Sequence, residues 1–168
     1  MAERNPNLIS PKTMEAMAST SGGSRELYSE IFTKINNAKD KPKKIEVLRK
    51  YNTPNMRMVL KGAFDPKIEW ELPPGIPPYI ANEAPAGTEH TYLELEAKRL
   101  YNFVKGGNNQ LNKIRKETLF IQMLEGLHAD EAKILIDMKN KTLNKTYKGL
   151  TSEMVKEAFG WNADFVKP

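Results

Sequence analysis

Hydrophobic residues recur every three or four positions along most of this chain, the spacing that places them on one face of an α-helix. The clearest example predicts a helix from about Arg25 to Asn37, with Ser24 as its N-terminal cap. Similar faces predict helices over about residues 42–51, 54–63, 91–105, 109–125, 130–143 and 151–159. Thr53 and Thr151 are expected to cap two of them, and Gly106 and Gly160 to end two. We therefore expect a mainly α fold, a compact domain in which five or six of these segments are helices.

Two of these segments carry more specific expectations. Around the second half of the 109–125 helix, apolar side chains point in nearly all directions, so this helix is expected to be central, and Gly126 to be its left-handed stop. Thr91 and Glu94 have the spacing of a capping box, which would open the helix over residues 91–105.

Residues 66–87 interrupt the helical pattern. The segment Ile68–Leu72 alternates and predicts one short strand or an extended arm, and Pro73–Tyr79 is typical of polyproline II with turns. The segment is too apolar for a purely solvated linker, because it contains Trp70, Ile76, Tyr79 and Ile80. Two interpretations stay open: a strap packed across the helices, or an arm that docks on a partner.

Length and composition indicate one domain. The 168 residues, 39% hydrophobic and 28% charged, are ordinary for a globular protein. Residues 1–23 are expected to be a flexible lead-in, followed by a single helical domain over residues 24–168 with a short aromatic tail over residues 160–168. With no cysteine, no apolar signal segment and no stretch long enough to span a bilayer, the expected location is the cytoplasm and no membrane partner is expected.

No catalytic constellation is recognisable. Glu125 and His128 have the Glu-x-x-His spacing of di-iron bundles, but no second such motif exists and Gly126 interrupts the helix. The other carboxylate–imidazole cluster, Glu89-His90 with Glu94, is explained by the preference for acids at a helix start. We therefore expect no enzyme activity, no cofactor and no metal.

The net charge of +5 allows attraction to nucleic acid when the lysines share one face. Three basic clusters stand out: Lys39 to Lys50, Lys113 to Lys116, and Lys139 to Lys148. The last two supply the candidate nucleic-acid-binding residues Lys113, Arg115, Lys116, Lys139, Lys141, Lys145, Tyr147 and Lys148. Lysines for phosphates and a tyrosine for stacking would suit a single strand. The alternative is a solvated helix end, where lysines complement the helix dipole.

Several strings carry a family resemblance: Leu60–Pro66, Tyr101–Asn109, Phe120–Glu125, Tyr147–Thr151 and Val155–Phe159. They resemble a family of uncharacterised proteins of similar length encoded by T4-like tailed bacteriophages of marine and enteric bacteria, over about residues 24–168. The resemblance implies a viral protein made in the cytoplasm of a host bacterium. It brings no catalytic residue with it.

Three functions remain as hypotheses. The first is an accessory protein that binds nucleic acid in phage replication, recombination or transcription. The second is a protein-binding adaptor or inhibitor of a host or phage machine, such as the sliding clamp or RNA polymerase, and the third is a virion structural component. Candidate partner-binding residues are Trp70, Ile76 and Tyr79 in the irregular segment and Trp161, Phe165 and Val166 in the tail. The ending Asp164-Phe165-Val166 is similar to clamp-binding peptides, although a tail folded back on the core is the alternative.

Overall fold

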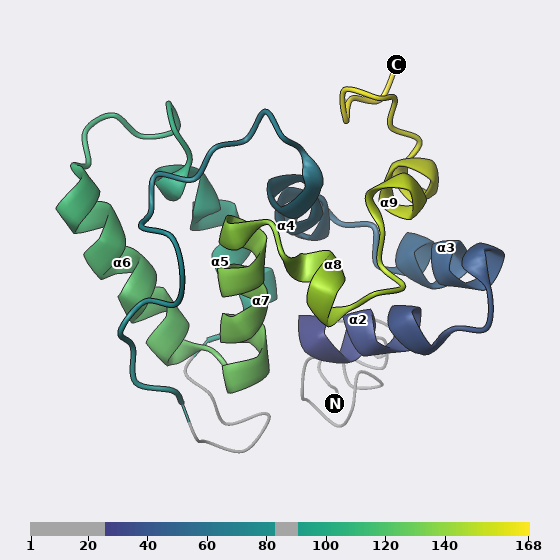
Figure 1. Ribbon diagram of the computed structural model, residues 1–168, viewed down its shortest axis with the longest axis horizontal. Helices are drawn as coiled ribbons and strands as arrows, with labels where there is room; N and C mark the ends of the chain where they lie inside the picture. Colours follow the sequence, from purple (N-terminus) through teal and green to yellow (C-terminus); the bar gives the residue numbers. More distant parts are fainter. Residues whose placement is uncertain (1–25, 83–90) are drawn as a thin grey trace, which may run out of the picture.

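Eight α-helices and one 3-10 helix form the regular structure of residues 26–82 and 91–168, which are the residues that the computed structural model describes (Figure 1). They are α2 (Tyr28–Asn37), α3 (Lys41–Lys50), α4 (Pro54–Phe64), α5 (Leu93–Glu96), η1 (Ala97–Phe103), α6 (Lys113–Gly126), α7 (Ala129–Asn140), α8 (Leu143–Thr146) and α9 (Ser152–Phe159). The expected mainly α fold is confirmed. The expected lead-in over residues 1–23 lies outside the described residues.

Side-chain caps begin three of the helices, and those by Thr53 and Thr151 were expected from the sequence. Asp40 accepts the backbone N–H of Lys43 at 3.0 Å in α3, Thr53 that of Met56 at 3.1 Å in α4, and Thr151 that of Met154 at 3.2 Å in α9. Pro occupies the first turn of α3 and of α4, where a missing N–H leaves no helical hydrogen bond unmade.

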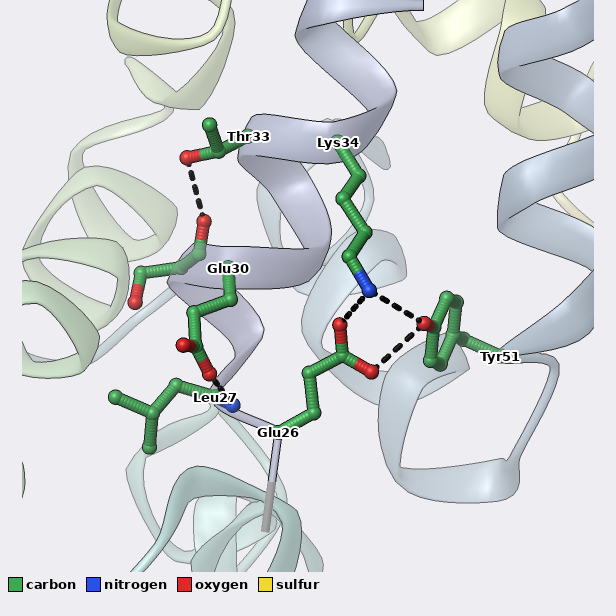
Figure 2. A network of polar contacts seen from close by, with 7 residues as sticks. Glu26, Leu27, Glu30, Thr33, Lys34 and Tyr51 are labelled. Atoms are coloured by element: carbon green, nitrogen blue, oxygen red, sulfur yellow. Dashed lines mark hydrogen bonds and ion pairs between the residues drawn. The ribbon is translucent and has the colours of Figure 1, made fainter. Parts of the chain in front are cut away.

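The start of α2 differs from the prediction. The helix begins at Tyr28 rather than Arg25, and the expected cap Ser24 lies outside the described residues. Glu30 accepts the backbone N–H of Leu27 at 2.7 Å, which satisfies a donor just before the first turn. Figure 2 shows the adjoining network, in which the Glu26 carboxylate accepts from the Lys34 ammonium and from the Tyr51 hydroxyl. These side chains tie Glu26, just before α2, and the last turn of α2 to the end of α3.

The predicted helix over residues 91–105 is two elements, α5 and η1, and the predicted capping box is wrong. Tyr92 precedes α5 without a side-chain cap, because the Glu94 carboxylate turns away to accept from the Tyr28 hydroxyl and the Asn55 amide. The apolar residues Ala97, Leu100 and Phe103 are all buried. Their spacing of three residues places them on one face of a 3-10 helix, which explains the tighter winding.

The central helix is α7, not the predicted 109–125 segment. In α6, which starts only at Lys113, four residues are buried, whereas α7 is buried nearly all round. Helix α7 contacts α2, α4, α6 and α8 and lies in the middle of the molecule (Figure 1). Gly126 is also not a left-handed stop: it is the last residue of α6, and the extended Leu127 follows it. Leu127 is fully buried, so the chain turns inward there instead of reversing over a glycine.

The described part of the irregular segment, residues 66–82, forms a strap over α6 and α7. Its first part is extended and makes one isolated antiparallel bridge, between Trp70 and Val104, instead of a strand. Two backbone hydrogen bonds flank the bridge, from Glu71 to Phe103 at 2.7 Å and from Lys105 to Glu69 at 2.8 Å. Further along, the backbone N–H of Ile80 donates to the Glu125 carboxylate at 2.9 Å, which fixes the strap near the end of α6.

Trp70 anchors the strap to α4. Its indole N–H donates to the Gly62 carbonyl at 3.0 Å, and a Cβ at position 62 would lie 2.5 Å from the indole ring. Only glycine allows α4 and the ring to approach this closely. Trp70 therefore packs against the core, as expected if the segment is a strap packed across the helices.

Candidate functional site

Three lysines predicted to contact nucleic acid instead donate to protein oxygens of the strap or of the end of α4, from which the strap leaves; we call Lys116, Lys139 and Lys141 the strap lysines. The Lys116 side chain is 2% exposed and pairs with the Glu71 carboxylate, whose pKa the Lys116 hydrogen bond lowers. Lys116 is the residue of the second basic cluster that faces inward, while Lys113 and Arg115 are exposed at the start of α6. A buried and paired ammonium is not available to a phosphate.

Lys139 and Lys141, at the end of α7, donate to main-chain oxygens of the strap and of the end of α4, respectively. The Lys139 ammonium donates to the carbonyls of Pro73 and Gly75 at 2.8 and 2.7 Å and to the Asn140 side chain at 2.8 Å. Lys141 follows the helix in the left-handed conformation and donates to the carbonyls of Gly62 and Asp65 at 2.6 and 3.0 Å. Burial lowers the pKa of both amines. Lys139 therefore fixes the strap, and Lys141 fixes the end of α4, from which the strap leaves.

One groove is lined both by a candidate partner-binding residue and by two candidate nucleic-acid-binding residues. Trp70, Lys139 and Lys141 line an open groove of about 710 Å³ between the root of the strap and the start of α9. Trp70 also borders a second groove, of about 490 Å³, that Lys113 and Ile114 line on the side of α6. In the first groove the Lys139 ammonium donates to carbonyls of the strap and the Lys141 ammonium to carbonyls at the end of α4, so both charges are used within the fold.

Exposed lysines also gather where the loop after α8 meets the C-terminus of α2. The backbone N–H of Gly149 donates to the Asn36 side chain at 2.7 Å, which brings the loop after α8 to the C-terminus of α2. In Figure 1 this loop passes beside α2 on its way to α9. We call the exposed lysines of this region the lysine end: Lys39, Lys41, Lys43, Lys145 and Lys148.

Lys44 organises this region from within. Its ammonium donates to the carbonyls of Ile35, Asn36 and Ala38 at 3.1, 3.0 and 2.9 Å, the last carbonyls of α2 and its turn. These contacts offset the negative end of the helix dipole. Two members of the lysine end have acidic partners on the surface: Lys41 lies 3.3 Å from Glu157, and Lys43 lies 3.7 Å from Glu46.

Tyr147 packs against the core. Its ring meets Phe32 edge-on, with centroids 5.5 Å apart, and is half-buried. Burial, with Asp130 and Asp137 nearby, raises the pKa of its hydroxyl to about 12. The ring already has an aromatic partner, so the stacking on a base expected from the sequence has no support in its position.

The C-terminal tail folds back on α9. After Gly160, whose φ of 70° ends the helix as expected, the Trp161 ring packs 4.9 Å from Phe159 and 6.0 Å from Phe165. Phe165 is 4% exposed, whereas Val166 is 48% exposed. The arrangement is that of the folded-back alternative. Binding to a sliding clamp stays a prediction.

The two carboxylate–histidine patterns are explained by local structure where it is described. The His128 Nδ1 accepts the backbone N–H of Asp130 at 3.1 Å, so His128 caps α7, and Glu125 accepts from the strap. Glu89 and His90 lie outside the described residues. Within residues 26–82 and 91–168 no group of three or more His, Cys, Asp or Glu could hold a metal. In the same part of the chain no helix is long and apolar enough to cross a membrane.

Sequence reasoning missed a buried carboxylate at the centre of the fold. Glu131 is 1% exposed, and its oxygens accept the backbone N–H of Tyr28 at 2.7 Å and of Leu93 at 2.9 Å. It thereby joins the first turns of α2 and α5 to α7. The available signal was its position: Glu131 lies four residues before Leu135 and seven before Met138, on a buried face of the helix.

The fold and these surfaces define a mainly helical protein with buried charges under a strap and exposed lysines at one end. The chain belongs to a family of unknown function, DUF6433, which it matches over residues 31–145, more than half of its length. The matched range includes the strap and the strap lysines, but not α9 or the tail. No curated protein and no solved structure matches the chain.

Proposed function

We propose that this chain is a non-enzymatic accessory protein of a T4-like bacteriophage that binds nucleic acid through the lysine end, in replication, recombination or transcription. The observation that carries the proposal is the contact of Gly149 with Asn36, because it joins lysines about a hundred residues apart in sequence on one part of the surface. Such clustering on one face is what a phosphate-binding footprint needs.

The acidic partners of the lysine end are weak competitors. The pairs Lys41–Glu157 and Lys43–Glu46 are solvent-exposed, with at least half of each side chain accessible. Exposed ion pairs contribute about 0–1 kcal/mol, so a phosphate can replace the carboxylate at little cost. Lysines contact phosphates without reading bases, and Tyr147 is turned to the core. Binding should therefore be salt-dependent and weakly sequence-specific.

The test is titration of single- and double-stranded DNA and RNA at low and high salt, with a matched pair of double variants. Lys39→Ala/Lys148→Ala removes one lysine from each segment of the lysine end. Lys113→Ala/Arg115→Ala removes the same charge from the exposed start of α6. The first variant should lower the salt dependence of log Kd by about one unit per lysine, and the second should leave it near the wild-type value.

Two outcomes contradict the proposal. If the protein binds none of the four nucleic acids at low salt, it is not a nucleic-acid-binding protein. Equal weakening by both double variants would mean that net charge alone attracts nucleic acid, without a defined surface.

The cellular setting is tested separately. A protein of this function should be recovered from the host cytoplasm with nucleic acid or the replication and transcription machinery of infected cells. Recovery in purified virus particles would instead favour the virion structural component considered from the sequence.

A further inference from the structure

The strap carries an alternating pattern of exposed and covered side chains. Ile76 is 78% exposed and Ile80 is 80% exposed, and Pro78 between them is exposed as well, whereas Pro77 and Tyr79 are partly covered. Alternation with a period of two is the property of an extended backbone. We call Ile76, Pro78 and Ile80 the apolar ridge.

The ridge is held in place from below. Asn140 donates to the Gly75 carbonyl at 3.1 Å and accepts the Gly75 N–H at 3.3 Å, next to the contacts that Lys139 makes with Pro73 and Gly75. At the other end Ile80 donates to Glu125, and Tyr79 packs against the hydrophobic core. The backbone on both sides of the ridge is therefore fixed before any partner binds.

Exposure of these side chains has a cost that the fold does not recover. An isoleucine left in water forgoes the stabilisation that burial of its side chain would supply. A single exposed isoleucine is normal on a protein surface. Here two exposed isoleucines lie on one face of a tethered segment, and the prolines between them limit its backbone freedom. Much of the entropy cost of ordering the segment for a partner is therefore already met by the fold.

We propose that the apolar ridge is a docking segment for a partner protein with an aromatic-lined groove. Pro74, Pro77 and Pro78 lack the N–H donors that strand addition requires, so the partner has to recognise side chains instead of extending a sheet. Grooves lined by aromatic rings accept extended proline-containing segments in this way.

A second copy of this chain is a poor occupant of the ridge. From Ile76 to Ile80 an extended chain spans roughly 13 Å. A stable interface buries about 800 Å² on each partner, more than three side chains meeting a similar ridge can supply. A groove that encloses the ridge from both sides gains more contact for each side chain.

The first experiment places a photo-reactive residue at position 76 of the full chain, with a matched probe at position 114, in infected cells. Ile114 on α6 is 78% exposed, the same as Ile76, so the two probes differ in place but not in accessibility. We expect a cross-link from position 76 that maps to an aromatic-lined groove and is absent from position 114. A position-76 cross-link to nucleic acid alone, to a second copy of the chain, or to the same proteins as position 114 overturns the proposal.

The second experiment measures affinity with the purified partner so identified. Ile76→Ser/Ile80→Ser should weaken binding at least about tenfold, whereas Ile114→Ser should change it less than about twofold. Neither variant should shift Tm, because all three side chains are exposed. Equal affinity of the wild type and the double variant sinks the proposal. The salt-dependent binding of nucleic acid is measured independently, so either surface can fail without the other.

Discussion

The strap region and the lysine end use the same residue type in opposite ways. Each strap lysine directs its ammonium to protein oxygens: Lys116 to a carboxylate, Lys139 to three acceptors and Lys141 to two carbonyls. The five lysines of the lysine end project into solvent. Burying a charge without partners is costly, so a lysine enters the interior only where acceptors meet it. The difference shows that lysine density along a sequence does not measure basic surface.

Glu131 extends the comparison of buried and exposed charges to a carboxylate. Its substitution should have the largest effect on the free energy of unfolding. Replacing it with Ala leaves two buried backbone N–H groups without this acceptor and separates α2 and α5 from α7. We expect Glu131→Ala to lower the free energy of unfolding by about 3–5 kcal/mol. The exposed Glu46→Ala should change it by less than about 0.5 kcal/mol. Urea unfolding of both variants measures the difference, and similar midpoints would contradict a central role for Glu131.

The next prediction compares two lysines of the same helix. Lys116→Ala removes a buried stem and the partner of Glu71, and should cost about 2 kcal/mol and loosen the strap. Lys113→Ala, at the exposed start of α6, should be neutral within about 0.5 kcal/mol. Denaturant unfolding gives the energies, and hydrogen exchange of the Glu71 amide reports on the strap. Equal stability of the two variants would erase the distinction between buried and exposed lysines.

Much of the fold could be predicted because its rules are local. The caps by Thr53 and Thr151 and the left-handed Gly160 depend on a few neighbouring residues. The capping box predicted at Thr91 and Glu94 is wrong because local spacing does not reveal contacts between distant residues. The Glu94 carboxylate accepts the hydroxyl of Tyr28, which lies 66 positions away in sequence.

The candidate site was predictable only in part, for the same reason. Spacing within the third basic cluster does not show that Lys139 meets the strap while Lys148 lies beside α2, because both placements depend on contacts between distant segments. The apolar strap was recognisable from Trp70 and the prolines. Which isoleucines it would expose was not, since that depends on the surface of α6 and α7 beneath it.

The tail is an intermediate case, in which accessible lysines hold a segment. Lys67 donates to the Asp164 carbonyl at 2.7 Å, and the Lys156 ammonium lies 5.2 Å from the centre of the Phe165 ring. Truncation after Gly160 should lower Tm by several degrees, because it removes the packing of Trp161 and Phe165.

A clamp pull-down with the same truncation tests the other role of the tail. A lower Tm with unchanged clamp recovery assigns the tail to structure. Loss of clamp recovery at unchanged Tm would make the tail a binding peptide. The matched control is Val166→Ser, because Val166 is half-exposed and belongs to the clamp-like ending without supporting the packing of Phe165.

Removing the Tyr147 hydroxyl should change stability least of these variants at neutral pH, and its effect should appear only at high pH, where the hydroxyl ionises. This hydroxyl has a pKa of about 12 in the folded chain against an ordinary value of 10.0, mainly because of burial. The folded state thus holds this proton more tightly than the unfolded state does. The stability linked to it is fully present below pH 10 and is lost as pH rises from about 10 to about 12.

Removing the hydroxyl should therefore change the alkaline limb of the stability curve and little else. Tyr147→Phe keeps the ring against Phe32 but cannot ionise. Its Tm should match that of the wild type near pH 7, and the variant should become the more stable protein as pH rises above 10. Tyr28, whose pKa burial also raises, remains in the variant, so alkaline unfolding is delayed and not abolished. Tm measured in steps from neutral pH to pH 12 decides the matter. If the two curves of Tm against pH coincide, the Tyr147 hydroxyl is solvent-exposed in the folded protein. Stacking of its ring on a base at the lysine end would then be supported again.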